Sequence, residues 1–108
     1  MTISTADGLD GVLEDEHWET HILKGHPELA PYHDLVVETL KTPDGVYRSK
    51  RDGTTRVYVK SCHGIVIGAA PVESIALLVF VQEKTGFVAT AYFAAAIWRG
   101  LGARIWPS

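Results

Sequence analysis

The sequence predicts an α+β fold in which two N-terminal helices pack on one face of a four-stranded antiparallel sheet. Before the turn signal at residues 42–45 (TPDG), apolar residues recur at helical spacing. After it come short apolar or alternating runs, bounded by residues typical of turns. The 108 residues have the length of one domain, and 46% hydrophobic and 21% charged residues are ordinary proportions for a globular protein.

The two helices are expected over residues 9–24 and from Pro31 to about residue 40. The first of these segments has only a few apolar residues, and acidic residues occupy most of its middle. The second begins at a proline, which suits the first turn of a helix. The residues that then recur at helical spacing are Tyr32, Leu35, Val36, Thr39 and Leu40. Residues 1–10 are polar and rich in Gly and Asp, which predicts a frayed terminus.

The four strands are expected over residues 46–49, 54–61, 75–83 and 87–93. Asp52 and Gly53 supply a tight hairpin turn between the first two. Residues 64–71 are apolar but include two glycines and a proline, so they predict a loop or an interrupted strand.

The last segment, residues 94–108, is apolar. Positions 94, 97, 98, 101 and 105 fit one helical stripe, although Gly100 and Gly102 weaken it. The segment therefore predicts a short C-terminal helix docked on the sheet. The alternative is an exposed apolar patch that binds a partner or a second copy of the chain.

Several classes of protein are disfavoured by the composition. The single cysteine, Cys62, excludes an intramolecular disulfide framework and a Cys-rich zinc module. The first residues lack the basic and apolar regions of a signal peptide. The longest apolar run, residues 75–81, is far shorter than the roughly 20 residues that cross a bilayer. We therefore expect a cytoplasmic protein with no membrane partner.

The charge is unevenly distributed. Residues 1–30 sum to −6, whereas residues 31–108 sum to +3. The segment from Lys41 to Lys60 contains six basic residues and only two acidic ones. This segment is either a basic surface for a polyanion or a solvated hairpin with its cations facing water.

Four of the five histidines fall within 17 residues: His17, His21, His26 and His33. His17 and His21 are four residues apart and would share a helical face. The stretch HWETH has the outer histidines of a metalloprotease motif, but Trp18 replaces the glutamate that serves as the base. A zinc site could still combine His17 and His21 with a carboxylate or His26. Surface or capping histidines are the other interpretation.

Two strands carry polar side chains on one face. Alternation puts Thr90 and Tyr92 on one side of the last strand, and Arg56, Tyr58 and Lys60 on one side of the second. If both faces point the same way, their cations and hydroxyls suit a phosphodiester. The solvated face of an antiparallel sheet gives the same pattern.

Three blocks in this order carry a resemblance: HILKGHPE (21–28), TLKTPDG (39–45) and GFVATAY (86–92). In them the chain resembles the small phage- and toxin-associated nuclease-like families of the barnase–EndoU–colicin–RelE superfamily. The resemblance implies two N-terminal helices on a four-stranded antiparallel sheet. It also implies cleavage of RNA, often tRNA, without metal or cofactor. The 2′-hydroxyl attacks the adjacent phosphate and leaves a 2′,3′-cyclic phosphate.

The resemblance also implies roles for individual residues. His21 and His26 serve as general base or acid, and Thr90 and Tyr92 orient the phosphate. One cation of the basic hairpin stabilises the phosphoryl charge. Arg48, Arg51, Arg56 and Lys60 all remain open for this role, and Arg51 is the candidate chosen for testing. A nucleotide stacks on an aromatic such as Tyr58 or Trp18. The residues expected to bind substrate are Lys24, Arg48, Arg56, Tyr58 and Lys60.

The expected partners are RNA, an antitoxin or immunity protein, and a second copy held through residues 94–108. Two alternatives stay open. One is a non-catalytic binding module on the same fold. The other is a small metal-dependent hydrolase built on His17, His21 and His26.

Overall fold

The computed structural model describes residues 1–95 and 100–107 and confirms the α+β class. Within these residues, one sheet has five antiparallel strands in the order β6-β5-β4-β3-β7, and a second has two, β1 and β2. The four predicted strands are present as β3 to β6, so the expectation of a four-stranded sheet is wrong by one added edge strand. The strands are β1 Thr2–Ser4, β2 Asp10–Val12, β3 Gly45–Ser49, β4 Thr55–Ile67, β5 Ala70–Gln82, β6 Val88–Ala94 and β7 Leu101–Trp106.

The N-terminus is an ordered hairpin, so the prediction of a frayed segment over residues 1–10 is wrong. β1 and β2 pair antiparallel, with Thr2 opposite Val12. Ile3 between them is buried in the main core. The Val12 amide donates a 2.7 Å hydrogen bond to the carbonyl of Gly86, which ties the hairpin to the turn between β5 and β6. Because residues 10–12 form a strand, the first helix begins later than expected.

The first helical run spans residues 15–25 without a break: α1 Asp15–His17, the π-helical η1 Trp18–Ile22 and α2 Leu23–Gly25. Trp18 and Ile22 are four apart and both buried, so this run packs one face on the core. The 3-10 helix η2 (Pro27–Tyr32) and then α3 (His33–Lys41) follow.

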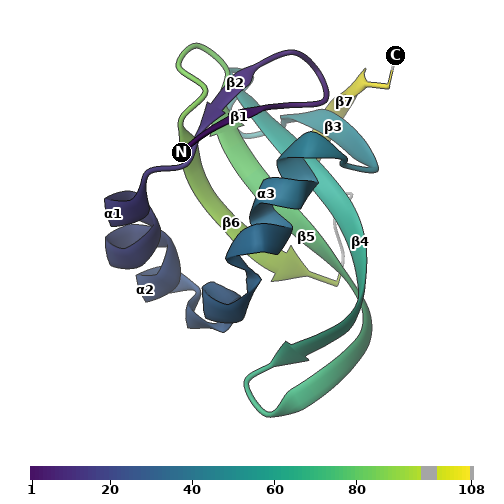
Figure 1. Cartoon of the computed structure of the whole chain (residues 1–108). Helices are drawn as coiled ribbons and strands as arrows, with labels where there is room; N and C mark the ends of the chain where they lie inside the picture. The colour runs from purple at the N-terminus through teal and green to yellow at the C-terminus, as the bar shows by residue number, and fades with distance from the viewer. Residues whose placement is uncertain (96–99, 108) are drawn as a thin grey trace.

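The second predicted helix is confirmed as α3, although Pro31 lies in the 3-10 turn before it. α3 buries Val36, Thr39 and Leu40 and contacts β4 and β5. In Figure 1 it lies across one face of the five-stranded sheet. In the part of the chain that the structure describes, no helix combines the length and apolarity needed to cross a membrane.

The central hairpin is longer than predicted. β4 and β5 pair along most of their 13 residues each, so residues 64–71 complete both strands around a turn. Gly68 takes a φ of +63° at this turn, a conformation that glycine adopts without strain. Tyr32 holds the tip because its hydroxyl accepts a 2.8 Å hydrogen bond from the Val66 amide.

The C-terminal segment forms an edge strand, so the predicted C-terminal helix is wrong for residues 101–106. β7 pairs antiparallel with β3. A Cβ at Gly102 would lie 3.0 Å from the carbonyl oxygen of Arg48, so the glycine lets the two backbones approach. Ile105 and Trp106 pack partly against the main core. The predicted stripe also included positions 97 and 98, which lie outside the described residues.

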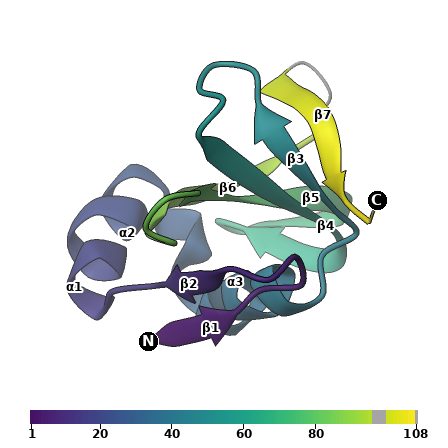
Figure 2. The same ribbon diagram turned by 90° about the horizontal axis from the view of Figure 1, so that it is seen from above.

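The sheet curls toward the face opposite α3 (Figure 2). Ala94 on β6 and Leu101 on β7, at opposite edges of the strand order, line one cavity. A small second core lies on this face, formed by Val57, Val59 and Leu78. The main core lies on the other face, under the helices.

Candidate functional site

A cleft of about 300 Å³ opens between the helical run 15–25 and strand β6. It brings together four residues that the sequence analysis assigned to the site from two distant segments. Tyr92 adjoins the cleft, because its ring centroid lies 5.3 Å from that of His26. The lining residues are Thr20, His21, Lys24, Gly25, His26 and Thr90.

The helical wall of the cleft follows from the burial of Trp18 and Ile22. With these two side chains in the core, His21 and Lys24, three residues apart, share an exposed side of the run. The helix ends at His26, whose backbone leaves helical geometry with φ −137° and ψ 70°. The His26 amide still donates to the Ile22 carbonyl at 2.9 Å, which fixes this residue at the end of the wall.

A carboxylate stands beside one nitrogen of His26. The Nδ1 atom lies 3.5 Å from an oxygen of Glu28, and the two side chains are 35% and 24% exposed. A carboxylate at this position favours the neutral tautomer that has its proton on Nδ1, facing Glu28. The Nε2 atom then carries the lone pair that can accept a proton.

His21 is supported from behind by His17. The two rings are stacked, with centroids 4.6 Å apart and planes 16° from parallel. His17 Nε2 lies 2.8 Å from the carbonyl oxygen of Ala89 on β6. Because a carbonyl oxygen only accepts, this nitrogen carries the proton. His17 therefore fastens the helical wall to the strand wall.

The three histidines of the zinc alternative do not converge. Over residues 1–95 and 100–107, no three His, Cys, Asp or Glu side chains are grouped so that they could hold a metal ion. The geometry of His17, His21 and His26 thus gives no support to the zinc site considered from the sequence.

The two polar strand faces point to opposite sides of the sheet, contrary to the expectation that they combine. Tyr58 is paired with Val79, which is paired with Ala91, so these three share one face. Thr90 is next to Ala91 in the strand and therefore faces the other side. Tyr58 is fully buried in the main core, which leaves no exposed ring for a base to stack on.

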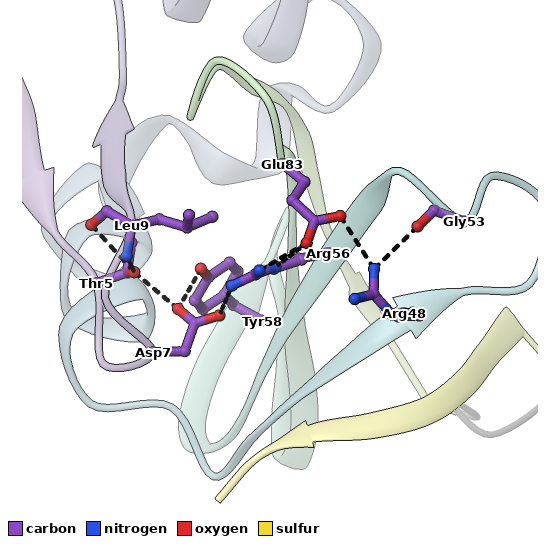
Figure 3. Close-up of polar contacts among 8 residues, drawn as sticks. All are labelled: Thr5, Asp7, Leu9, Arg48, Gly53, Arg56, Tyr58 and Glu83. Carbon is purple, nitrogen blue, oxygen red and sulfur yellow. Dashed lines mark hydrogen bonds and ion pairs between the residues drawn. The ribbon is translucent and has the colours of Figure 1, made fainter.

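Arg56 and Arg48 are held in a network of ion pairs (Figure 3). Arg56 lies 2.6 Å from Asp7 and 2.6 Å from Glu83, and Arg48 lies 3.0 Å from Glu83. The Tyr58 hydroxyl donates a hydrogen bond to Asp7. These contacts connect the loop between β1 and β2 to the main sheet. They occupy three residues predicted to bind substrate.

The network shifts several acid–base equilibria. Burial alone would raise the pKa of Asp7, but hydrogen bonds from Tyr58, Thr5 and Arg56 outweigh it and hold that pKa below its usual value. Hydrogen bonds from Arg56 and Arg48 lower the pKa of Glu83. Burial, followed by the hydrogen bond to Asp7, raises the pKa of Tyr58. These shifts keep the two carboxyl groups charged and the Tyr58 hydroxyl protonated, which is the state in which they can pair with the arginines and with each other.

The other two predicted cations are placed differently. Lys60 donates to the Thr42 carbonyl at 2.7 Å and lies 4.0 Å from Glu38. Arg51 is exposed in the turn between β3 and β4 and lines a second cavity together with Tyr92. The candidate site therefore combines His21, Lys24, His26 and Thr90, with Tyr92 and Arg51 beside it.

Sequence reasoning did not single out Glu28 or Thr20 for this site, and it considered His17 only as a zinc ligand. Glu28 stands two residues after His26, and this short spacing was the signal that could have identified it. The contact of His17 with β6 spans 72 residues, and no local pattern indicates it.

Comparisons of the chain with protein-family models, curated proteins and solved structures found no significant match. The resemblance to nuclease-like families stays a prediction.

Proposed function

We propose that the protein is an endoribonuclease that cleaves RNA without a metal ion, in the cleft between the helical run 15–25 and β6. The observation that carries the proposal is the lining of this cleft, where two imidazoles, an ammonium group and two threonine hydroxyls surround one space. Phosphodiester transfer needs a base, an acid and a cation near the phosphate, and this set supplies all three.

His26 is the general base. Its Nε2 accepts the proton of the ribose 2′-hydroxyl, and Glu28 beside Nδ1 stabilises the imidazolium that forms. The 2′-oxygen bonds to phosphorus as the bond from phosphorus to the 5′-oxygen breaks. Protonated His21 donates the proton to that leaving oxygen. The products are a 2′,3′-cyclic phosphate and a free 5′-hydroxyl.

Lys24 and Thr90 hold the phosphate. The Lys24 ammonium stabilises the negative charge that grows on the non-bridging oxygens, and the Thr90 hydroxyl orients them from β6. Arg51 is further along the same face of the sheet, beyond Tyr92. It suits a flanking phosphate better than the reacting one.

Cleavage of RNA in the presence of EDTA tests this proposal. We expect total tRNA and a structured RNA to give specific fragments that end in cyclic phosphate. H26Q and H21Q should each slow the reaction by about a hundredfold or more, because each removes a proton-transfer group. H63Q is the matched control. His63 is exposed on the part of the β4–β5 hairpin that lies beyond the residues paired with β6.

The outcomes separate the alternatives. Full activity in both H26Q and H21Q would place the chemistry outside this cleft. Loss of activity only when EDTA is present would favour the metal-dependent alternative. No cleavage by a folded protein would leave the non-catalytic binding module, with the same cleft as its binding surface.

A further inference from the structure

We infer that the cavity inside the curled sheet is a pocket for an unpaired nucleobase, so that the substrate is single-stranded RNA. The inference rests on the proposed function and adds a substrate class to it. The base belongs to the nucleotide next to the scissile phosphate.

The cavity measures about 280 Å³, just below the range of roughly 300–1,000 Å³ typical of pockets for whole drug-sized ligands. Its apolar walls come from three strands: Leu78 and Phe80 on β5, Tyr92 on β6 and Leu101 on β7. The curl of the sheet brings the β6 and β7 walls to opposite sides of one space. A flat, apolar guest such as a base suits this slot.

Two aromatic rings form one wall. Phe80 and Tyr92 stack with centroids 5.2 Å apart and planes 29° from parallel, and both side chains are half-buried. Stacking on such rings is how proteins bind unpaired bases of any sequence. The pocket is therefore expected to prefer a base over a sugar or a phosphate.

Tyr92 connects the cavity to the catalytic cleft. Its ring lies 5.2 Å from Phe80 on the cavity side and 5.3 Å from His26 on the cleft side. A base seated against this wall thus has its own phosphate within reach of His26. One strand of RNA can therefore place a base in the cavity and the phosphate beside it in the cleft by passing the Tyr92 ring.

The rim of the cavity has the charge that RNA requires. Arg51 stands there with Ser49, and among the described residues that line the cavity none is acidic. A guanidinium pairs with phosphate oxygens or with acceptors on a base edge. The apolar slot with a cation at its mouth matches a nucleotide better than an apolar peptide side chain.

Paired RNA does not fit this arrangement. In an A-form helix each base is stacked and paired, and the groove that displays the base edges hides their flat faces. A base enters a slot walled by β6 and β7 only after it leaves the stack. The pocket therefore selects loops, bulges and single strands.

A substitution of Phe80 tests the pocket without changing the catalytic cleft, because Phe80 lines the cavity and not the cleft. F80L removes the ring and keeps an apolar side chain, so we expect KM for a single-stranded oligoribonucleotide to rise about tenfold with kcat unchanged. F80W keeps a ring and should keep a low KM. F93L is the matched control, since Phe93 packs in an edge contact with Tyr32 on the other face.

Two measurements on the wild-type protein do not depend on how a variant folds. Annealing the oligoribonucleotide to its complement should slow cleavage about tenfold or more. Replacing the nucleotide next to the cleaved bond by an abasic one should raise KM as F80L does. Equal cleavage of duplex and single strand, or no effect of the abasic nucleotide, would overturn the inference.

A non-cleavable ligand separates this inference from the proposed function. A 2′-O-methyl oligoribonucleotide lacks the attacking hydroxyl, so its affinity reports binding alone. If F80L binds this oligoribonucleotide more weakly than F93L does, the result supports a base-binding pocket even if the protein cleaves no RNA. Equal affinity for both variants would refute the pocket even if cleavage by His26 stands.

Discussion

Replacing Asp7 by asparagine tests whether the ion-pair network fastens the N-terminal hairpin to the sheet. The Asp7 side chain is 4% exposed and lies 2.6 Å from Arg56, whose side chain is 15% exposed. Removing one partner of a buried pair costs about 3–5 kcal/mol. Arg56 keeps its contact with Glu83, and D7N keeps an oxygen that can accept from Tyr58. We therefore expect a loss of about 2–3 kcal/mol in the free energy of unfolding.

Urea denaturation at pH 7 measures this loss directly. For a chain of this length, the same change corresponds to a fall of roughly 10 °C in Tm. D10N is the control, because Asp10 is exposed on β2 in the same hairpin. It should stay within about 0.5 kcal/mol of the wild type.

The pH dependence of the free energy of unfolding provides a second test of the network, because the direction of its change can be predicted. The pKa of folded Asp7 lies below its usual value of 3.8, because hydrogen bonds outweigh the opposing effect of burial. A carboxyl with a lowered pKa contributes stability above its unfolded pKa and loses it as the pH falls through the folded value. The stability of wild type and D7N should therefore converge below about pH 4. A D7N variant as stable as the wild type at pH 7, or a constant difference down to pH 2, would refute the reasoning.

Two further substitutions probe the fold. G86A should lose at least about 2 kcal/mol in thermal or urea unfolding, because Gly86 has a φ of +75° and a Cβ there would meet a carbonyl oxygen of β2. G53A, in an open turn with nothing near its Cβ, should be close to neutral, and equal losses would contradict this account. Y32F should leave global unfolding nearly unchanged but speed limited proteolysis at the tip of the β4–β5 hairpin, since it removes the hydrogen bonds to Val66. An unchanged digestion rate would mean that other contacts hold the tip.

Elements with a strong local pattern could be predicted from the sequence. Val36 and Leu40 are four apart and fully buried, and the helix around them was expected. Leu77, Val79 and Val81 are fully buried on the interior strand β5, which appears as an apolar run in the sequence. In both cases the signal lies within one element, so no distant contact is needed to see it.

The two ends of the chain could not be predicted, because their partners lie far away in the sequence. β1 and β2 have three residues each, and their stability depends on contacts such as that of Asp7 with Arg56, 49 residues away. The C-terminal segment has a helical apolar stripe, but Gly102 fits a close approach to β3. Tertiary pairing overrides a weak local preference in each case.

The candidate site was predictable where its members are close in sequence. His21 and Lys24 lie within one helical run that His26 ends, and spacing alone puts the first two on one side. The expectation that Tyr58 and Thr90 share a face was wrong, because it depends on pairing through β5. A shift of one residue in that register moves every side chain to the other face. The sequence of either strand alone therefore does not determine whether the two side chains point to the same face.

The cleft depends on the same contacts that fix the N-terminus. Its helical wall follows β2 directly, and its strand wall follows Gly86 directly. The hydrogen bond from Val12 to Gly86 joins the two walls where they begin, and His17 joins them again at Ala89. The Asp7 network holds the hairpin from which the helical wall starts. Arg56 and Tyr58, which were expected to bind substrate, thus contribute to the cleft indirectly, because they hold the hairpin that aligns its two walls. We therefore expect D7N to cleave RNA more slowly than the wild type even at temperatures where D7N is still folded.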